Sequence, residues 1–228
     1  GRNRREASAP IVFQTAGKRR VIIAFGCPTS GIPCKWQSTT DLPGINLLSA
    51  PPARSIHQAC AIIQSTKQPG DVAVASIHWG DNWGYDIPSR QRELAHALID
   101  EADIDVVFGH SSHHPKAFEL YREKLILYGC GDLINDYEGI SGYEAYRSDL
   151  ALMYFPEIAA DGKLKSLEMV PFQVRSMRLV RANAADATWL RDTLQQQCAE
   201  LRIDLRVDLS GVARLRVDAL HRQTRHEP

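Results

Sequence analysis

The stretch VAVASIHWG, residues 72–80, is followed by a helical pattern over Ser89–Ala102 and then by VVFGH, residues 106–110. Residues 72–77 and 106–108 are continuous apolar runs, which are typical of strands buried on both faces of a sheet. In the segment between them, apolar residues recur on one side of a helix. A strand, a helix and a second strand at this spacing predict a βαβ unit with parallel strands.

Similar patterns extend this unit toward both ends of the chain. Val21–Phe25 (VIIAF) is a third continuous apolar run, and Arg54–Thr66 carries apolar residues on one helical face. Further along, β-like runs on either side of Asp161-Gly162 indicate an antiparallel hairpin with a tight turn. The sequence therefore predicts an α/β fold, with a mostly parallel sheet flanked by helices and an antiparallel C-terminal part.

We expect the chain to have two parts. We place the main domain at residues 11–175 and an extension at residues 176–228. In the extension we expect a helix capped by Asn183, a strand or hairpin within 203–217, and a disordered tail. Residues 1–10 are polar and charged, and we expect them to be a frayed lead-in.

The overall composition excludes several classes of protein. The 27 basic and 27 acidic residues balance, so neither a basic surface for nucleic acid nor a polybasic membrane patch is expected. No apolar run is long enough to span a membrane, and no signal peptide is visible. The five cysteines are odd in number and lack CxxC spacing, which argues against a disulfide framework and for buried thiols. Because the chain starts with Gly1, its compartment is left open.

Histidines follow two of the predicted strands. His78 comes at the end of the first, and His110, His113 and His114 lie just beyond the second, after Gly109. Ligands of open parallel sheets bind at the carboxyl ends of the strands, and neutral imidazole is a common metal ligand. A lone histidine after a strand is more often structural, but two motifs at one sheet edge favour a metal site. We therefore expect the imidazoles to converge.

Longer patterns from Asp71 to Asp136 resemble the metallophosphatase-like domain of CapA-type capsule and poly-γ-glutamate synthesis proteins. The resemblance is specific, because its motifs are long, ordered and correctly spaced over about residues 11–156. The matching segments are DLPGINLL (41–48), HWG (78–80), QRELAHALID (91–100), VVFGHSSH (106–113) and KLILYGCGD (124–132).

The resemblance implies half of a calcineurin-like metallophosphatase sandwich that binds divalent metal ions. It identifies His78, His110 and His113 as metal ligands. The family's other ligands and its general acid belong to a first half that this sequence does not show, so a dinuclear centre would need that half. We expect the chain by itself to bind metal weakly and to associate through uncovered strands.

The resemblance leaves the substrate-facing residues less defined, and no catalytic residue is assigned. Where relatives carry a glutamate after the HWG motif, this chain has Asn82. His114 is either substrate-facing or structural, and Asp132 either orients an imidazole or is an ordinary turn residue. Trp79, together with Trp83 and Tyr85, forms either a substrate wall or part of the core. The candidate substrate-binding residues are Trp79, Asn82, His114 and Asp132.

These observations lead to one main functional prediction and two alternatives. The main one is a metal-dependent hydrolase of capsule or poly-γ-glutamate biosynthesis, acting on an anionic polymer or a phosphoester. The first alternative is a non-catalytic scaffold subunit of a polymer synthase or export complex, in contact with other synthase subunits. The second is a polysaccharide-binding module that uses Trp79 and Trp83. The metal and the bond cleaved are left open.

Overall fold

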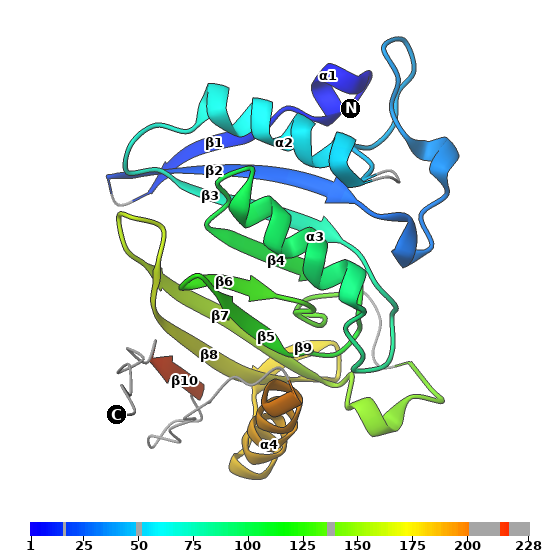
Figure 1. Ribbon diagram of the computed structural model, residues 1–228. Helices are drawn as coiled ribbons and strands as arrows, with labels where there is room; N and C mark the ends of the chain where they lie inside the picture. Colours follow the sequence, from blue (N-terminus) through cyan, green and yellow to red (C-terminus); the bar gives the residue numbers. More distant parts are fainter. Residues whose placement is uncertain (16, 49–51, 136–139, 201–214, 219–228) are drawn as a thin grey trace, which may run out of the picture.

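The computed structural model describes residues 1–15, 17–48, 52–135, 140–200 and 215–218, and it contains two sheets (Figure 1). The first has six strands in the order β1-β2-β3-β4-β6-β5. The four central strands are parallel, and β1 and β5 are antiparallel edge strands. Their bounds are β1 Ile11–Thr15, β2 Lys18–Gly26, β3 Val72–His78, β4 Val106–His110, β5 Phe118–Tyr121 and β6 Lys124–Leu127.

The second sheet is antiparallel. Strand β8 pairs with β7, β9 and β10, and the β7–β8 hairpin closes through the predicted turn at Asp161-Gly162. These strands are β7 Leu150–Ile158, β8 Leu164–Arg175, β9 Arg178–Arg181 and β10 Leu215–Asp218. The predicted α/β fold, with a mostly parallel sheet and an antiparallel C-terminal part, is confirmed.

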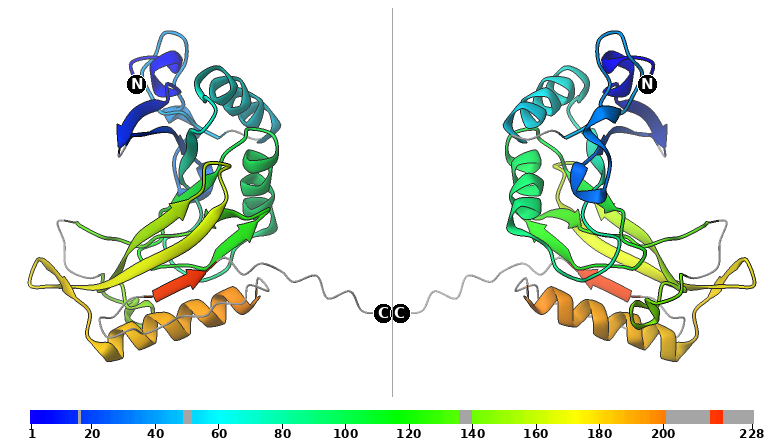
Figure 2. Two further views of the ribbon diagram at one scale, coloured as in Figure 1. Left: turned by 90° about the vertical axis from the view of Figure 1, so that its left-hand side faces the viewer. Right: turned by 90° about the vertical axis from the view of Figure 1, so that its right-hand side faces the viewer.

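In the described part of the chain, the α-helices are α1 Arg4–Ala7, α2 Pro52–Thr66, α3 Ser89–Asp100 and α4 Ala184–Glu200. Figure 2 shows α2 and α3 against one face of the first sheet, the second sheet behind its other face, and α4 beneath the second sheet. Short 3₁₀ helices, η1 Pro28–Ser30, η2 Cys34–Trp36 and η3 Glu144–Tyr146, lie in the connecting loops. Among the described residues, no helix has the length and apolarity needed to cross a bilayer.

The side chains of the first sheet are divided between two hydrophobic cores. Ala73, Ala75 and Ile77 of β3 are fully buried beneath α2 and α3. Val74, on the opposite face, packs in the second core together with residues of β7, β8 and α4. This alternation follows from the period of two along a strand. It is the reason that both faces of the parallel strands are apolar, as their sequences indicated.

Two expectations about the chain are corrected by the structure. Residues 1–10 are not a frayed lead-in, since Asn3 Oδ1 caps α1 by accepting from the Glu6 amide at 3.0 Å, and the Arg4 amide donates to the Thr39 carbonyl at 2.6 Å. All five cysteines are free, as expected, but Cys34 is exposed.

Asn183 caps α4 as predicted. Most of the strand predicted within 203–217, and all of the tail, lie outside the described residues.

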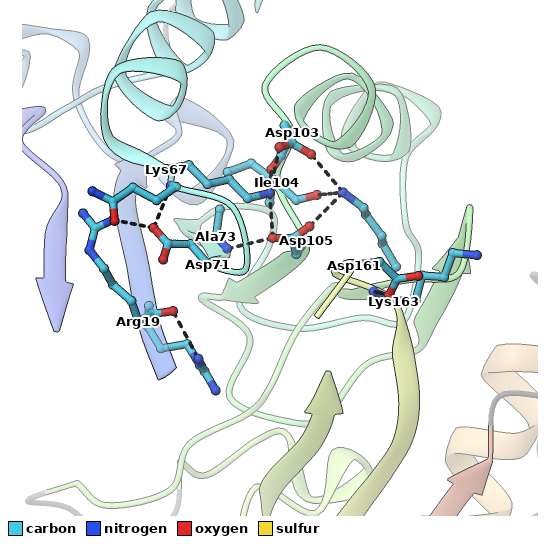
Figure 3. Close-up of polar contacts among 12 residues, drawn as sticks. Arg19, Lys67, Asp71, Ala73, Asp103, Ile104, Asp105, Asp161 and Lys163 are labelled. Carbon is cyan, nitrogen blue, oxygen red and sulfur yellow. Dashed lines mark hydrogen bonds and ion pairs between the residues drawn. The ribbon is translucent and has the colours of Figure 1, made fainter. Parts of the chain in front are cut away.

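A buried ionic network closes the edge of the sheet at which β3 and β4 begin (Figure 3). The Asp105 carboxylate, only 2% exposed, pairs with Lys67 Nζ at 2.9 Å and Lys124 Nζ at 2.8 Å, and accepts from the Ala73 amide at 2.8 Å. The same two lysines pair with Asp103, whose side chain is 66% exposed. The network joins the end of α2 to the starts of three strands, and it keeps a buried carboxylate neutralised.

We predict that Asp105→Asn destabilises the protein by about 3–5 kcal/mol, because it removes the buried carboxylate that two partly buried lysines share and leaves them only the exposed Asp103. The matched control is Asp103→Asn, which removes a carboxylate that the same lysines contact at the surface, and it should cost no more than about 1 kcal/mol. Urea unfolding followed by circular dichroism measures both. Equal losses for the two variants would contradict the importance given to the buried carboxylate.

Candidate functional site

Two histidines meet at the opposite edge of the sheet, where β3 and β4 end. His78 and His110 are paired residues in the parallel register, and their Nδ1 atoms lie 3.1 Å apart. The Nε2 atom of His110 is 3.2 Å from the Ser76 hydroxyl. The predicted convergence of His78 and His110 is confirmed, and it follows from the register alone, because neighbouring parallel strands bring equivalent positions side by side.

The environment favours the uncharged form of both imidazoles. Burial lowers the pKa of His78 and of His110, and for His110 the nearby His78 lowers it further. Neutral imidazole is the form that binds metal ions. Metal–nitrogen bonds of about 2.0–2.1 Å place the nitrogens of neighbouring ligands roughly 2.9–3.4 Å apart, and the observed 3.1 Å separation falls within this range. The pair therefore fits two ligands of one ion.

His113 lies beside the pair and has a different set of contacts. Its Nδ1 atom is 3.0 Å from Asp132 Oδ2, and its Nε2 atom is 3.4 Å from the side-chain nitrogen of Asn82. It is close enough for its charge to lower the pKa of His78. A carboxylate on one ring nitrogen fixes the orientation of the other nitrogen toward a ligand. Of the two roles left open for Asp132, the structure supports that of orienting an imidazole.

Of the three predicted metal ligands, His78 and His110 thus form a close pair, and His113 lies next to them. Within the described ranges, no three histidine, cysteine, aspartate or glutamate side chains form a group that could hold one ion. The described residues provide two imidazoles at coordination distance of each other and a third, His113, in an adjoining loop. Asn82 is exposed near this third histidine and accepts from Ser111 Oγ at 3.2 Å.

The expectation that Trp79 contacts substrate is corrected. Its side chain is 2% exposed, its indole nitrogen donates to the Tyr128 carbonyl at 3.0 Å, and its ring stacks on that of Tyr128. A Cβ on Gly109 would overlap the indole nitrogen, so the glycine of the second motif makes room for the tryptophan of the first. Trp79 belongs to the core that fixes the two histidine loops.

His114 is also structural. It is completely buried, and its Nδ1 atom lies 3.1 Å from the Pro115 carbonyl. Burial is the main cause that lowers its pKa to about 4. Its ring packs edge-on against Tyr85 and nearly parallel to Tyr146. The substrate-facing alternative is therefore not supported.

Two tyrosines that the sequence did not single out, Tyr143 and Tyr146, complete this region. Trp83 stacks on Tyr143 with ring centroids 4.1 Å apart and ring planes within 2°, and it lies 5.2 Å from the ring of His113. Tyr146 contacts both Trp83 and Tyr85. Tyr143 and Tyr146 are far along the chain from any histidine motif. The spacing of three residues between the two tyrosines was the one sequence feature that could have marked them as part of the site.

Comparisons with known proteins agree with the motifs. Residues 1–137 match the family model described as bacterial capsule synthesis protein PGA_cap. A probable polyglutamine synthesis accessory protein of Mycobacterium tuberculosis is 47% identical over 182 residues, covering 78% of this chain and 48% of the relative. The PGA biosynthesis protein CapA of Bacillus subtilis is 27% identical over 136 residues, covering 60% of this chain and 32% of the relative.

The chain thus spans about half the length, or less, of these curated relatives. Among solved structures, a hypothetical protein from Thermus thermophilus aligns with a TM-score of 0.37 and 17% identity, over 75% of this chain and 58% of that one.

The pKa of His114 leads to a prediction about pH. Its pKa of about 4 lies below the ordinary value of 6.5, so its contribution to stability is complete above pH 6.5 and is lost as the pH falls toward 4. We expect the wild type to lose more free energy of unfolding on acidification than the His114→Gln variant. Urea unfolding at neutral and acidic pH measures this difference. Equal losses in the two proteins would contradict the assignment.

Proposed function

The chain belongs to the bacterial capsule synthesis protein PGA_cap family, and from this premise we propose that it is a metal-dependent, hydrolase-like component of polymer synthesis. Its relatives are named for capsule, poly-γ-glutamate or polyglutamine synthesis, and we extend to this chain a role with a glutamate- or glutamine-based polymer. The observation that carries the proposal is the imidazole pair of His78 and His110, with Nδ1 atoms 3.1 Å apart at the strand ends.

In this proposal, His78 and His110 would hold a divalent ion, and His113 would present its Nε2 atom to the same region. A divalent ion bound there supplies Lewis-acid polarisation and a water molecule of lowered pKa. Ser76 and Asp132 contact the far nitrogens of His110 and His113 and so orient these rings. A dinuclear centre would need ligands from outside the described residues.

The same chemistry limits the kinds of bond that such a site could hydrolyse. A metal site of this kind acts on a phosphoester or on the amide bond of a polymer, because both develop negative charge on an oxygen atom during attack. Asn82 is exposed beside His113, and its side-chain amide suits a hydrogen bond to such an oxygen. Of the four candidate substrate-binding residues that the sequence indicated, we therefore propose Asn82 for this role.

A second candidate function is that of a scaffold subunit in contact with a polymer synthase. Two observations favour it: a relative is named an accessory protein, and the described residues do not form a complete three-ligand group. The two functions differ in whether metal binding at the histidine pair is needed. They are separated by measuring metal binding and turnover on the same variants.

We predict that the 228-residue chain binds Co²⁺ or Zn²⁺ with a stoichiometry of no more than one, because only one close imidazole pair is available among the described residues. His78→Ala and His110→Ala should abolish this binding, and Asp132→Asn should weaken it about 10–100-fold by releasing His113. Isothermal titration measures affinity and stoichiometry, and the Co²⁺ absorption spectrum reports nitrogen ligation.

The control is His96→Ala, since His96 lies on α3 and pairs with Glu119, away from the strand ends. It should leave metal binding unchanged. Hydrolysis of bis-p-nitrophenyl phosphate by the metal-loaded chain, or by a longer form of the protein, would support the hydrolase. A properly folded protein with no affinity for metal would rule the hydrolase out and favour the scaffold.

A further inference from the structure

The aromatic rim, which we define as Trp83, Tyr85, Tyr143 and Tyr146, adjoins the candidate site. One face of Trp83 is covered by Tyr143, with centroids 4.1 Å apart, and His114 lies nearly parallel to Trp83 at 6.0 Å. The tyrosine itself is 40% exposed. Tyr143 is therefore the most accessible ring of the stack, and Trp83 lies between it and His114 and also contacts the ring of His113.

The rim is held in place by buried and charged groups on both sides. Tyr146 stacks on the fully buried His114 at 4.7 Å. The next residue, Arg147, forms ion pairs of 2.8 Å with Asp149 and Asp186. On the other side, the buried Lys116 donates to the Asp86 carbonyl at 2.9 Å and so fastens the loop that carries Trp83. A surface fixed in this way loses little entropy when a ligand binds.

The charged side chains around the rim are mostly acidic. Asp81, Asp86 and Glu144 are exposed next to the aromatic residues. Of the cations among the described residues, Lys116 and Arg147 lie next to the rim, and neither is available to a ligand, because the Lys116 side chain is buried and Arg147 is paired with two carboxylates. Such a surface repels a polyanion, whereas its carboxylates accept hydrogen bonds from uncharged N–H donors.

We propose that the aromatic rim binds an uncharged, amide-bearing segment of the polymer, with an amide plane stacked on the exposed face of Tyr143. A primary amide combines a flat face that packs on an aromatic ring with two N–H donors for neighbouring carboxylates. Between a glutamate- and a glutamine-based polymer, the rim therefore selects the glutamine type. This inference rests on the proposed role in polymer synthesis, within which it selects an uncharged polymer over an anionic one.

The test compares ligands of equal length that differ in charge. A capped glutamine oligomer should bind the 228-residue chain at least about tenfold more tightly than a capped glutamate oligomer, as measured by isothermal titration at low ionic strength. Tyr143→Ala should weaken binding of the glutamine oligomer about three- to tenfold, and Tyr143→Phe should retain it. The matched control is Trp36→Ala, since Trp36 is 54% exposed on η2 and distant in sequence from the rim.

Charge is tested separately by the double variant Asp81→Asn and Glu144→Gln, which should narrow the preference for the glutamine oligomer by strengthening binding of the glutamate oligomer. Tighter binding of the glutamate oligomer by the wild type, or full binding by Tyr143→Ala, would overturn the proposal. So would maltohexaose binding that depends on Tyr143 while neither oligomer binds, because the rim would then recognise saccharide.

Failure of this inference can be told apart from failure of the proposed function. His78→Ala should lose metal binding and keep oligomer binding, because the ring contacts of the rim are with His113 and His114. A chain that binds metal but shows no preference between oligomers refutes the rim assignment alone. A chain that binds the glutamine oligomer through Tyr143 but no metal refutes the hydrolase and leaves the rim assignment standing.

Discussion

The parallel register between β3 and β4 is the constraint on which the site depends. It places His78 directly opposite His110, and the same register carries back to Val74 opposite Val106 near the start of the strands. Side chains alternate along each strand, so Ala75 and Ile77 face α2 and α3, whereas Ser76 and His78 face the other way. A shift of one residue in either strand would send one imidazole into the helix-covered core.

The two ends of the parallel strands solve opposite electrostatic problems. At the amino ends, a buried carboxylate is stable because two lysine ammonium groups and a backbone amide surround Asp105. At the carboxyl ends, His78 and His110 are crowded and partly desolvated, which lowers the pKa of each and keeps them neutral. At one edge of the sheet, the carboxylate and the two ammonium groups therefore neutralise one another. At the other edge, the lowered pKa of both imidazoles favours binding of a cation over binding of a second proton.

The sequence could predict the positions of residues on strands but not those of residues in irregular loops. His78 and His110 lie on strands, so apolar runs and spacing were enough to bring them together before any side chain was placed. The period of two also shows why Trp79 is in the core: it follows His78 directly and must face the opposite side of the sheet. By contrast, Tyr143 reaches Trp83 through irregular loops, and α1 is held by contacts with Thr39 and Gly44 from a distant loop. Neither contact has a periodic signal in the sequence.

The hydrogen positions within the histidine pair connect the resting state to metal binding. With Nδ1 atoms 3.1 Å apart, one imidazole must donate and the other accept, so the uncomplexed pair shares one proton along this contact. Coordination through both Nδ1 atoms requires that both rings carry their proton on Nε2. For His110 this tautomer is supported by Ser76, whose hydroxyl oxygen lies 3.2 Å from Nε2 and can accept its hydrogen. Ser76 and His78 are on the same face of β3, so one strand supplies both a proposed ligand and a hydrogen-bond acceptor that suits the Nε2–H tautomer of its partner.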